Sequence, residues 1–208
     1  MAQFFSLFPE NPQPRLIRQA AEIIRAGGLV VFPTDSAYAL AGRTGHSELI
    51  NRIRHIRGVD ERHHLTLMVR DLSEIAHYAR VDNAQYRLIK AVTPGPYTFI
   101  LDGTKELPRR VLHPKRKTIG VRVPSHPVVA ALLAELDEPL LSSTLLLPGE
   151  EHPLTDADEI RSRLEKQVDL VIEAGGCGPE ATTVVDLTGG APELIRAGLG
   201  DLAPLGLD

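Results

Sequence analysis

The sequence has a single cysteine, Cys177, no tryptophan, and only 4% aromatic residues among its 208. One cysteine excludes a disulfide framework and a zinc site built from several thiolates, and it favours a reducing compartment. With so few aromatic rings, the chain lacks the platform on which RNA-recognition modules stack bases. Its longest apolar runs, such as 128–136, fall well short of the roughly 20 residues that span a bilayer. Because the N-terminus shows no secretory signal either, we predict a cytoplasmic protein with no membrane partner.

Several enzyme motifs are also missing. The sequence contains no Walker A sequence, no HExxH zinc motif and no GxSxG serine-hydrolase elbow. Residues 176–181 match GxGxxA, but a strand rather than a helix is predicted to follow them, so a dinucleotide site is not supported. We expect His63 and His64 to lie in a solvated loop, and Cys177 to be a small filler in a glycine-rich turn.

The composition is that of one soluble globular domain, with 43% hydrophobic and 24% charged residues. We predict a single domain over 12–200 with short terminal tails. The formal net charge of −4 conceals a gradient, because 148–208 contain four Lys or Arg and thirteen Asp or Glu, net −9, whereas 1–147 carry +5. The total charge argues against an anionic partner, but its distribution points to an anionic ligand of the N-terminal part.

Alternating strand and helix patterns predict an α/β fold in which helices cover a mixed sheet. A helix is expected from Pro12, capped by Asn11, to Gly27, and an all-apolar buried strand follows over 29–32. The remaining predicted elements are, in chain order, a helix capped by Ser47, strand 66–69, helices after Asp71 and Asp82, strands 97–101 and 118–123, helix 127–136, strand 140–143, helix 155–167 opened by a Thr155 cap, and strands 168–173, 182–187 and 193–196.

Polar side chains follow the first predicted strand. Thr34, Asp35, Ser36 and Tyr38 come directly after it, and ligands of α/β sheets bind beyond the carboxyl ends of strands. The same residue types are equally typical of a turn that they merely cap. The sequence leaves both interpretations open.

Basic residues gather in two segments: Arg52, Arg54, Arg57 and Arg62, and then Lys105, Arg109, Arg110, Lys115, Arg116, Lys117 and Arg122. Such runs usually form a solvated face. Arg122, however, is predicted inside an apolar strand, where an unpaired charge is costly, so it should face an anion or a carboxylate. Arg196 raises the same expectation, and Asp186 is a candidate carboxylate for either arginine. With the hydroxyl-rich loop, the two arginines fit an anionic, phosphorylated small molecule.

Seven segments in this order resemble the YrdC-like family of threonylcarbamoyl-AMP synthases, and within it the YciO branch. They are Pro33-Thr34-Asp35-Ser36 with Tyr38, Arg57 at a helix end, Pro94-Gly95-Pro96-Tyr97-Thr98-Phe99, Thr118-Ile119-Gly120-Val121-Arg122-Val123-Pro124 with His126-Pro127, Ser142-Ser143-Thr144, Thr182-Thr183-Val184-Val185-Asp186, and Arg196 with Gly198. Each segment alone is weak, but all seven in one order are specific.

The resemblance implies an open twisted sheet with a concave basic surface. It also implies a reaction in which L-threonine, bicarbonate and ATP with Mg²⁺ give threonylcarbamoyl-AMP and pyrophosphate for tRNA modification. By position, Thr34, Ser36, Arg122 and Thr182 would hold the amino acid. Arg57, Thr118, Ser142, Thr144 and Arg196 would line the nucleotide. None of these needs to be a covalent nucleophile, because such a site mainly orients reactants and neutralises charge.

Four positions depart from the family pattern. His55 replaces the lysine of Lys-x-Arg, Leu146 replaces the asparagine of Ser-x-Asn, Met68 stands where a histidine is usual, and Ala39 stands where the first motif has a glycine. Since losing one polar contact in a transition state costs about 3 kcal/mol, these changes predict weak or altered activity.

The alternative prediction is a non-catalytic protein that binds double-stranded RNA or tRNA through the same basic surface. Lys115, Arg116 and Lys117 would then supply phosphate contacts, and binding would weaken steeply with salt. A purely structural role is the third alternative, and the strand-embedded arginines argue against it.

Overall fold

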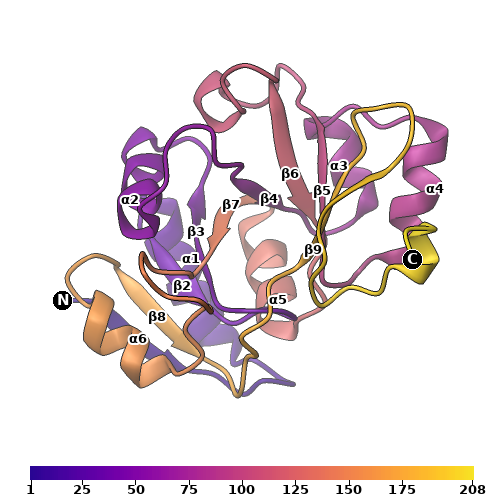
Figure 1. Cartoon of the computed structure of the whole chain (residues 1–208). Helices are drawn as coiled ribbons and strands as arrows, with labels where there is room; N and C mark the ends of the chain where they lie inside the picture. The colour runs from indigo at the N-terminus through magenta and orange to yellow at the C-terminus, as the bar shows by residue number, and fades with distance from the viewer.

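Ten strands form one open mixed sheet around which the other elements pack. The computed structural model describes residues 1–208. The strand order across the sheet is β1-β8-β2-β3-β7-β4-β6-β5-β9-β10 (Figure 1). The strands are β1 (Gln3–Ser6), β2 (Val30–Phe32), β3 (Ala39–Arg43), β4 (Thr66–Met68), β5 (Tyr97–Asp102), β6 (Thr118–Arg122), β7 (Leu140–Thr144), β8 (Leu170–Glu173), β9 (Thr183–Asp186) and β10 (Glu193–Arg196).

Six α-helices and one short 3₁₀ helix connect the strands, and a second 3₁₀ helix follows the last strand. The α-helices are α1 (Pro14–Arg25), α2 (Ser47–Arg57), α3 (Leu72–Tyr78), α4 (Asn83–Val92), α5 (Pro127–Leu136) and α6 (Ala157–Leu164), and the 3₁₀ helices are η1 (Arg109–Val111) and η2 (Ala203–Leu205). None of these helices has the length and apolar character needed to cross a bilayer. The ten-stranded mixed sheet and its helices confirm the mixed α/β architecture predicted from the sequence.

Two strands were not predicted, and each has a physical reason. β3 has the sequence ALAGR, whose small residues have weak strand preference, and it is held by pairing with β2 on one side and β7 on the other. β1 lies in the segment expected to be a tail before residue 12, but it pairs in parallel with β8. The N-terminal tail prediction is therefore wrong, because these residues form an edge of the sheet.

The predicted helix boundaries are wrong at three N-termini. α1 begins at Pro14 rather than Pro12, so Asn11 is not its cap. In α6 the cap is Asp156 rather than Thr155, because the Asp156 carboxylate accepts the Glu159 N–H at 2.7 Å. Ser47 is the first residue of α2 and not its cap.

The two faces of the sheet are covered by different helices. α1 and α5 pack against each other and share one hydrophobic core with β2, β3 and β8. The other core combines apolar residues of α2, α3, α4 and α6 with strand residues such as Leu67, Phe99 and Val121. Ala39 and Met68 belong to the α1/α5 core and also line the main cavity of the molecule. The cavity therefore begins where α1 and α5 cease to cover this face.

Candidate ligand cavity

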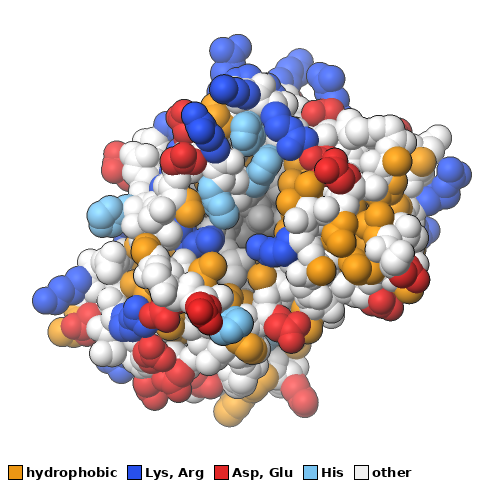
Figure 2. Space-filling model, viewed as in Figure 1, with side chains coloured by type: hydrophobic (Ala, Val, Ile, Leu, Met, Phe, Trp, Pro, Cys, Tyr) orange, Lys and Arg blue, Asp and Glu red, His pale blue; other side chains and the backbone are white.

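A cavity of about 840 Å³ opens on the sheet face that α1 and α5 leave uncovered. Figure 2 shows it as a hollow in the middle of the molecule, with histidine and basic side chains around it. The register of the strands brings its floor together: Ser142 of β7 pairs with Thr66 of β4, and Met68 pairs with Arg122 of β6. Residues far apart in sequence thereby converge on one concave surface.

Arg122 is buried at one part of this cavity and is already paired. Its side chain is 5% exposed, and it donates hydrogen bonds to the carboxylate of Asp35 and, at 3.3 Å, to Ser36 Oγ. Asp35 also accepts the Ser125 N–H at 2.8 Å. Burial lowers the pKa of Arg122, and the charge of Asp35 opposes that shift. The predicted carboxylate partner of Arg122 is confirmed, but it is Asp35 and not Asp186.

Only Nη2 of this guanidinium donates hydrogen bonds, so Nε and Nη1 have no partner. Arg122 Nε is buried and makes no hydrogen bond, although Arg122 lines the cavity. A charged donor that is buried without an acceptor raises the free energy of the folded protein. A ligand that supplies an acceptor for this guanidinium would therefore be strongly favoured.

Arg57 and Arg196 form the second cationic region, and neither is in an ion pair. Arg57, the last residue of α2, donates to the Leu146 carbonyl oxygen at 2.8 Å and to Ser143 Oγ. Arg196 of β10 donates to the Thr182 carbonyl oxygen from Nε and Nη2, at 3.1 and 2.9 Å. Burial and the charge of Arg196 lower the pKa of Arg57 to about 10. Since every partner of these two arginines is neutral, their charges remain available to an anion. Asp186, the predicted partner of Arg196, does not contact it.

Hydroxyl groups complete the cavity floor. Thr98 and Thr182 share a hydrogen bond of 2.8 Å between their side-chain oxygens, and Ser142 Oγ donates to the Thr66 carbonyl oxygen at 2.9 Å. Thr144 also lines the cavity. Such groups can exchange their internal hydrogen bonds for bonds to a polar ligand.

Six of the nine residues predicted to bind nucleotide or substrate line the cavity: Arg57, Arg122, Ser142, Thr144, Thr182 and Arg196. Thr34, Ser36 and Thr118 do not. Thr34 Oγ1 donates to the Ala37 carbonyl oxygen at 2.7 Å and lies 3.1 Å from Ser36 Oγ, so it stabilises the turn that carries Asp35. For Thr34, the structure therefore favours the turn interpretation over direct ligand contact.

His63 and His64 lie in a loop, as predicted, but this loop is not fully solvated. Both are half-buried and line the cavity. His64 Nε2 lies 2.7 Å from Thr118 Oγ1, and the His64 ring stacks on His113 with 5.0 Å between ring centroids. The signal that could have revealed them is their place directly before the buried strand β4. The turn after Arg57 folds them inward.

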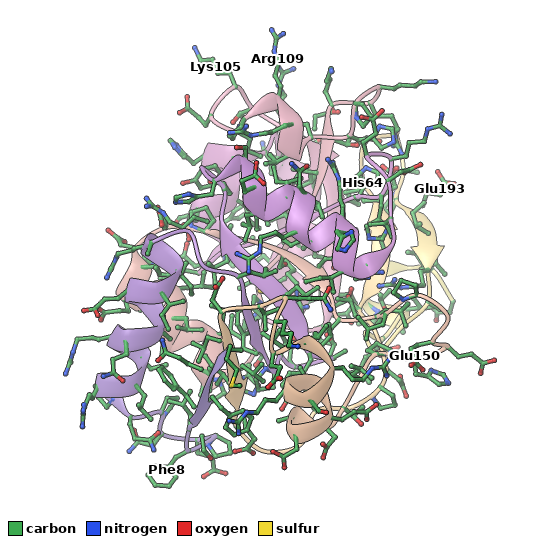
Figure 3. All side chains as sticks on the ribbon, turned by 90° about the vertical axis from the view of Figure 1, so that its left-hand side faces the viewer. Phe8, His64, Lys105, Arg109, Glu150 and Glu193 are labelled. Carbon is green, nitrogen blue, oxygen red and sulfur yellow. The ribbon has the colours of Figure 1, made fainter.

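The three residues predicted to contact RNA differ in their surroundings. Arg116 pairs with Asp186 at 2.5 Å and donates to Thr188 Oγ1 at 3.0 Å, and Lys117 Nζ donates to the Pro114 carbonyl oxygen at 2.6 Å. Lys115 is exposed and forms no ion pair. Lys105 and Arg109, from the same basic segment, extend away from the body of the protein (Figure 3). Phosphate contacts through 115–117 stay a prediction, and Arg116 would first have to leave Asp186.

The four departures from the family pattern lie in two different places. Ala39, Met68 and Leu146 line the cavity, where none of these side chains offers a hydrogen bond. His55 is exposed and borders a separate depression of about 240 Å³ with Leu147 and Pro148. Its imidazole therefore does not enter the main cavity. No group of three or more His, Cys, Asp or Glu side chains is placed to hold a metal ion.

Comparison with known proteins agrees with this architecture. A family model for Sua5, YciO and YrdC proteins, described as telomere recombination, matches residues 22–198. YciO of Escherichia coli K12, an uncharacterized protein, is 55% identical over 98% of this chain and 99% of its own length. The threonylcarbamoyl-AMP synthase of Halorhodospira halophila is 30% identical over 85% of this chain and 92% of its own.

Solved structures show the same fold. The crystal structure of E. coli YciO matches 99% of this chain and 100% of that chain with a TM-score of 0.96. P. abyssi Sua5 in complex with L-threonine matches 94% of this chain and 57% of its own, at 25% identity and a TM-score of 0.86. The chain therefore belongs to the Sua5/YciO/YrdC family.

Proposed function

We propose that this protein binds ATP and L-threonine in the cavity and joins them with bicarbonate to form threonylcarbamoyl-AMP and pyrophosphate. The observation that carries the proposal is the pair Arg57 and Arg196, two inward-facing cations whose partners are all neutral. Uncompensated guanidinium groups at the wall of a cavity favour a ligand with several negative charges, such as a triphosphate. The family relationship and the L-threonine complex of P. abyssi Sua5 support the choice of substrates.

The amino acid would occupy the region of Arg122. Its carboxylate can accept hydrogen bonds from the Arg122 guanidinium, whose Nε and Nη1 have no partner, and the hydroxyl groups of Thr98 and Thr182 are available to its polar atoms. The Asp35 pairing holds the Arg122 guanidinium in one orientation, so the donor is in place before the substrate arrives.

The chemistry needs positioned reactants rather than a protein nucleophile. The threonine amine attacks the carbon of bicarbonate, a C–N bond forms as water leaves, and a carbamate results. A carbamate oxygen then attacks the α-phosphorus of ATP, and the bond to the β-phosphate oxygen breaks, so that pyrophosphate leaves with the electron pair. Arg57 and Arg196 would stabilise the charge that develops on the phosphates. Mg²⁺ would arrive with ATP as its substrate complex and be held largely by phosphate oxygens.

The apolar side chains of Leu146 and Met68 affect the expected rate. Since each stands where a hydrogen-bonding group would contact the reactants, we expect turnover about a hundredfold below that of a homologue with polar groups there. Leu146→Asn is expected to recover part of this loss. The product would serve tRNA modification, and we expect the protein to act in the cytoplasm.

The test is pyrophosphate release by the purified protein, with a working homologue as the positive control. We expect release that requires ATP, L-threonine and bicarbonate together and that falls to background when any one is left out. Release from ATP alone, or none above a blank while the homologue is active, would refute the proposal.

A further inference from the structure

We propose that His63 is a third ligand of the anion held by Arg57 and Arg196, and that its imidazole takes up a proton when the anion binds. The inference rests on the proposed function, because the anion in question is the phosphate chain of ATP. It adds a proton-dependent contact that the two arginines alone do not provide.

His63 combines two properties that the other histidines near the site do not share, because His152, which also lines the cavity without a hydrogen bond, is exposed. The His63 side chain is half-buried, lines the cavity, and makes no hydrogen bond with another protein group. In contrast, the His64 ring bonds Thr118, and Nδ1 of His113 and of His126 each accept a backbone N–H. His63 is therefore a half-buried ring whose hydrogen-bonding capacity is left to a ligand.

The charges around His63 are almost all positive. Arg57 at the end of α2, Arg196 on β10 and the adjacent His64 disfavour its protonation, and Asp60 on its own loop is the one acid that favours it. Burial, together with these cations, lowers the pKa of His63 to about 4. Six further charged or titratable side chains lie around the same cavity: Tyr38, Arg62, Arg122, Glu151, His152 and Glu180.

A phosphate chain between Arg57 and Arg196 would reverse this balance. The ligand's negative charges would then be the nearest charges to His63, and an opposite charge at short distance favours the protonated imidazole. An imidazolium can donate a charge-assisted hydrogen bond to a phosphate oxygen, whereas the arginines are already fixed by the carbonyl oxygens of Leu146 and Thr182. Because the pKa of His63 would be higher in the complex than in the free protein, ATP binding takes up a proton at pH values between about 4 and about 6.5.

The test is an NMR titration of the His63 ring in the full chain, free and with saturating ATP. The ring signal is assigned by its absence in His63→Gln. This measurement reads the pKa of the imidazole itself, so protonation of ATP does not confuse it. We expect a value near 4 in the free protein and a rise toward the ordinary value of about 6.5 in the complex. His55→Gln, which changes an exposed histidine outside the cavity, should leave this rise intact.

Two results would overturn the inference, and they are distinguishable. If ATP binds and the pKa of His63 stays near 4, His63 is not a ligand and the proposed function stands. If ATP does not bind, the proposed function fails and this inference fails with it. Because the titration is done on the unchanged protein, poor folding of His63→Gln would not prevent the reading: the ring is then assigned through its neighbours along the chain.

Discussion

The two cationic regions of the cavity are built in opposite ways. Arg122 is buried against a carboxylate, Asp35, which neutralises its charge inside the protein. Arg57 and Arg196 are held only by neutral groups, the carbonyl oxygens of Leu146 and Thr182 and a serine hydroxyl. The charge of Arg122 is therefore neutralised by a protein carboxylate. The charges of Arg57 and Arg196 are left to be neutralised by a ligand.

Because of this difference, we expect the Arg122–Asp35 pair to affect the stability of the protein, and Arg57 and Arg196 to affect its affinity for an anion. A buried ion pair contributes little net stability when intact, but removing one partner strands a charge. An unpaired arginine at a cavity wall contributes little to folding and much to the capture of an anion. The substitutions below should therefore have their largest effects on different measurements.

The largest effect should come from breaking the buried pair. Asp35→Ala leaves the Arg122 guanidinium buried without its carboxylate, and we expect the free energy of unfolding to fall by about 3–5 kcal/mol. Urea unfolding followed by circular dichroism would measure it. The double variant Asp35→Leu with Arg122→Met removes both charges and should recover much of the loss. If Asp35→Ala lowers the free energy of unfolding by less than about 1 kcal/mol, the Arg122–Asp35 pair does not stabilise this part of the cavity wall.

The next effect concerns the unpaired arginines. Arg57→Ala and Arg196→Ala should each weaken ATP binding about ten- to hundredfold, since a hydrogen bond to a charged group is worth roughly 1.5–3 kcal/mol. The free energy of unfolding should change less than in Asp35→Ala, because no charged partner is stranded. Isothermal titration calorimetry with ATP would measure the affinity.

Lys115→Ala is the matched control for these two variants. It removes the same charge from an exposed side chain that forms no ion pair and does not line the cavity, so the affinity for ATP should stay unchanged. If all three variants weaken binding equally, the overall charge of the basic segment, rather than the unpaired arginines, attracts the ligand.

The smallest effect should come from a half-exposed pair, Arg116 with Asp186. Burial raises the pKa of Asp186, but hydrogen bonds from Thr188 and Arg116 outweigh it, so the pKa lies below 3.8. A carboxylate whose pKa is lower in the folded state stabilises the protein above its unfolded pKa, and this contribution is lost as pH falls through the folded value. We therefore expect Asp186→Asn to lower the free energy of unfolding by about 1 kcal/mol at pH 7.

The same analysis predicts the pH dependence of that variant. The difference between Asp186→Asn and the unchanged protein should shrink as the pH falls from about 5 to about 2, because both then lack the charge. Urea titrations at a series of pH values would measure it. A difference that grows in acid would contradict the lowered pKa of Asp186.

Much of the fold was predictable because several elements carry strong local signals. α5 has a proline at its start and an apolar run, and β6 alternates apolar residues around Arg122. β3 carries no such signal, since ALAGR becomes a strand only through its neighbours β2 and β7. Local preference predicts the first kind of element, and tertiary pairing decides the second.

The site was predictable only in part, for a similar reason. The strand-embedded position of Arg122 shows that it needs a partner, but that partner, Asp35, lies 87 residues earlier and is brought near by the order of the sheet. The inward position of His63 depends on the turn after α2 and on the buried strand β4. Residue types identify the chemistry that is needed, and the topology decides which residues meet.

The most direct test of the account is a crystal structure of the protein soaked with ATP and L-threonine. We expect the phosphate chain to lie between Arg57 and Arg196, the threonine carboxylate to lie at the Arg122 guanidinium, and the Arg122–Asp35 pair to remain intact. An empty cavity under saturating ligand, or phosphates bound at the exposed 105–117 segment instead, would contradict it.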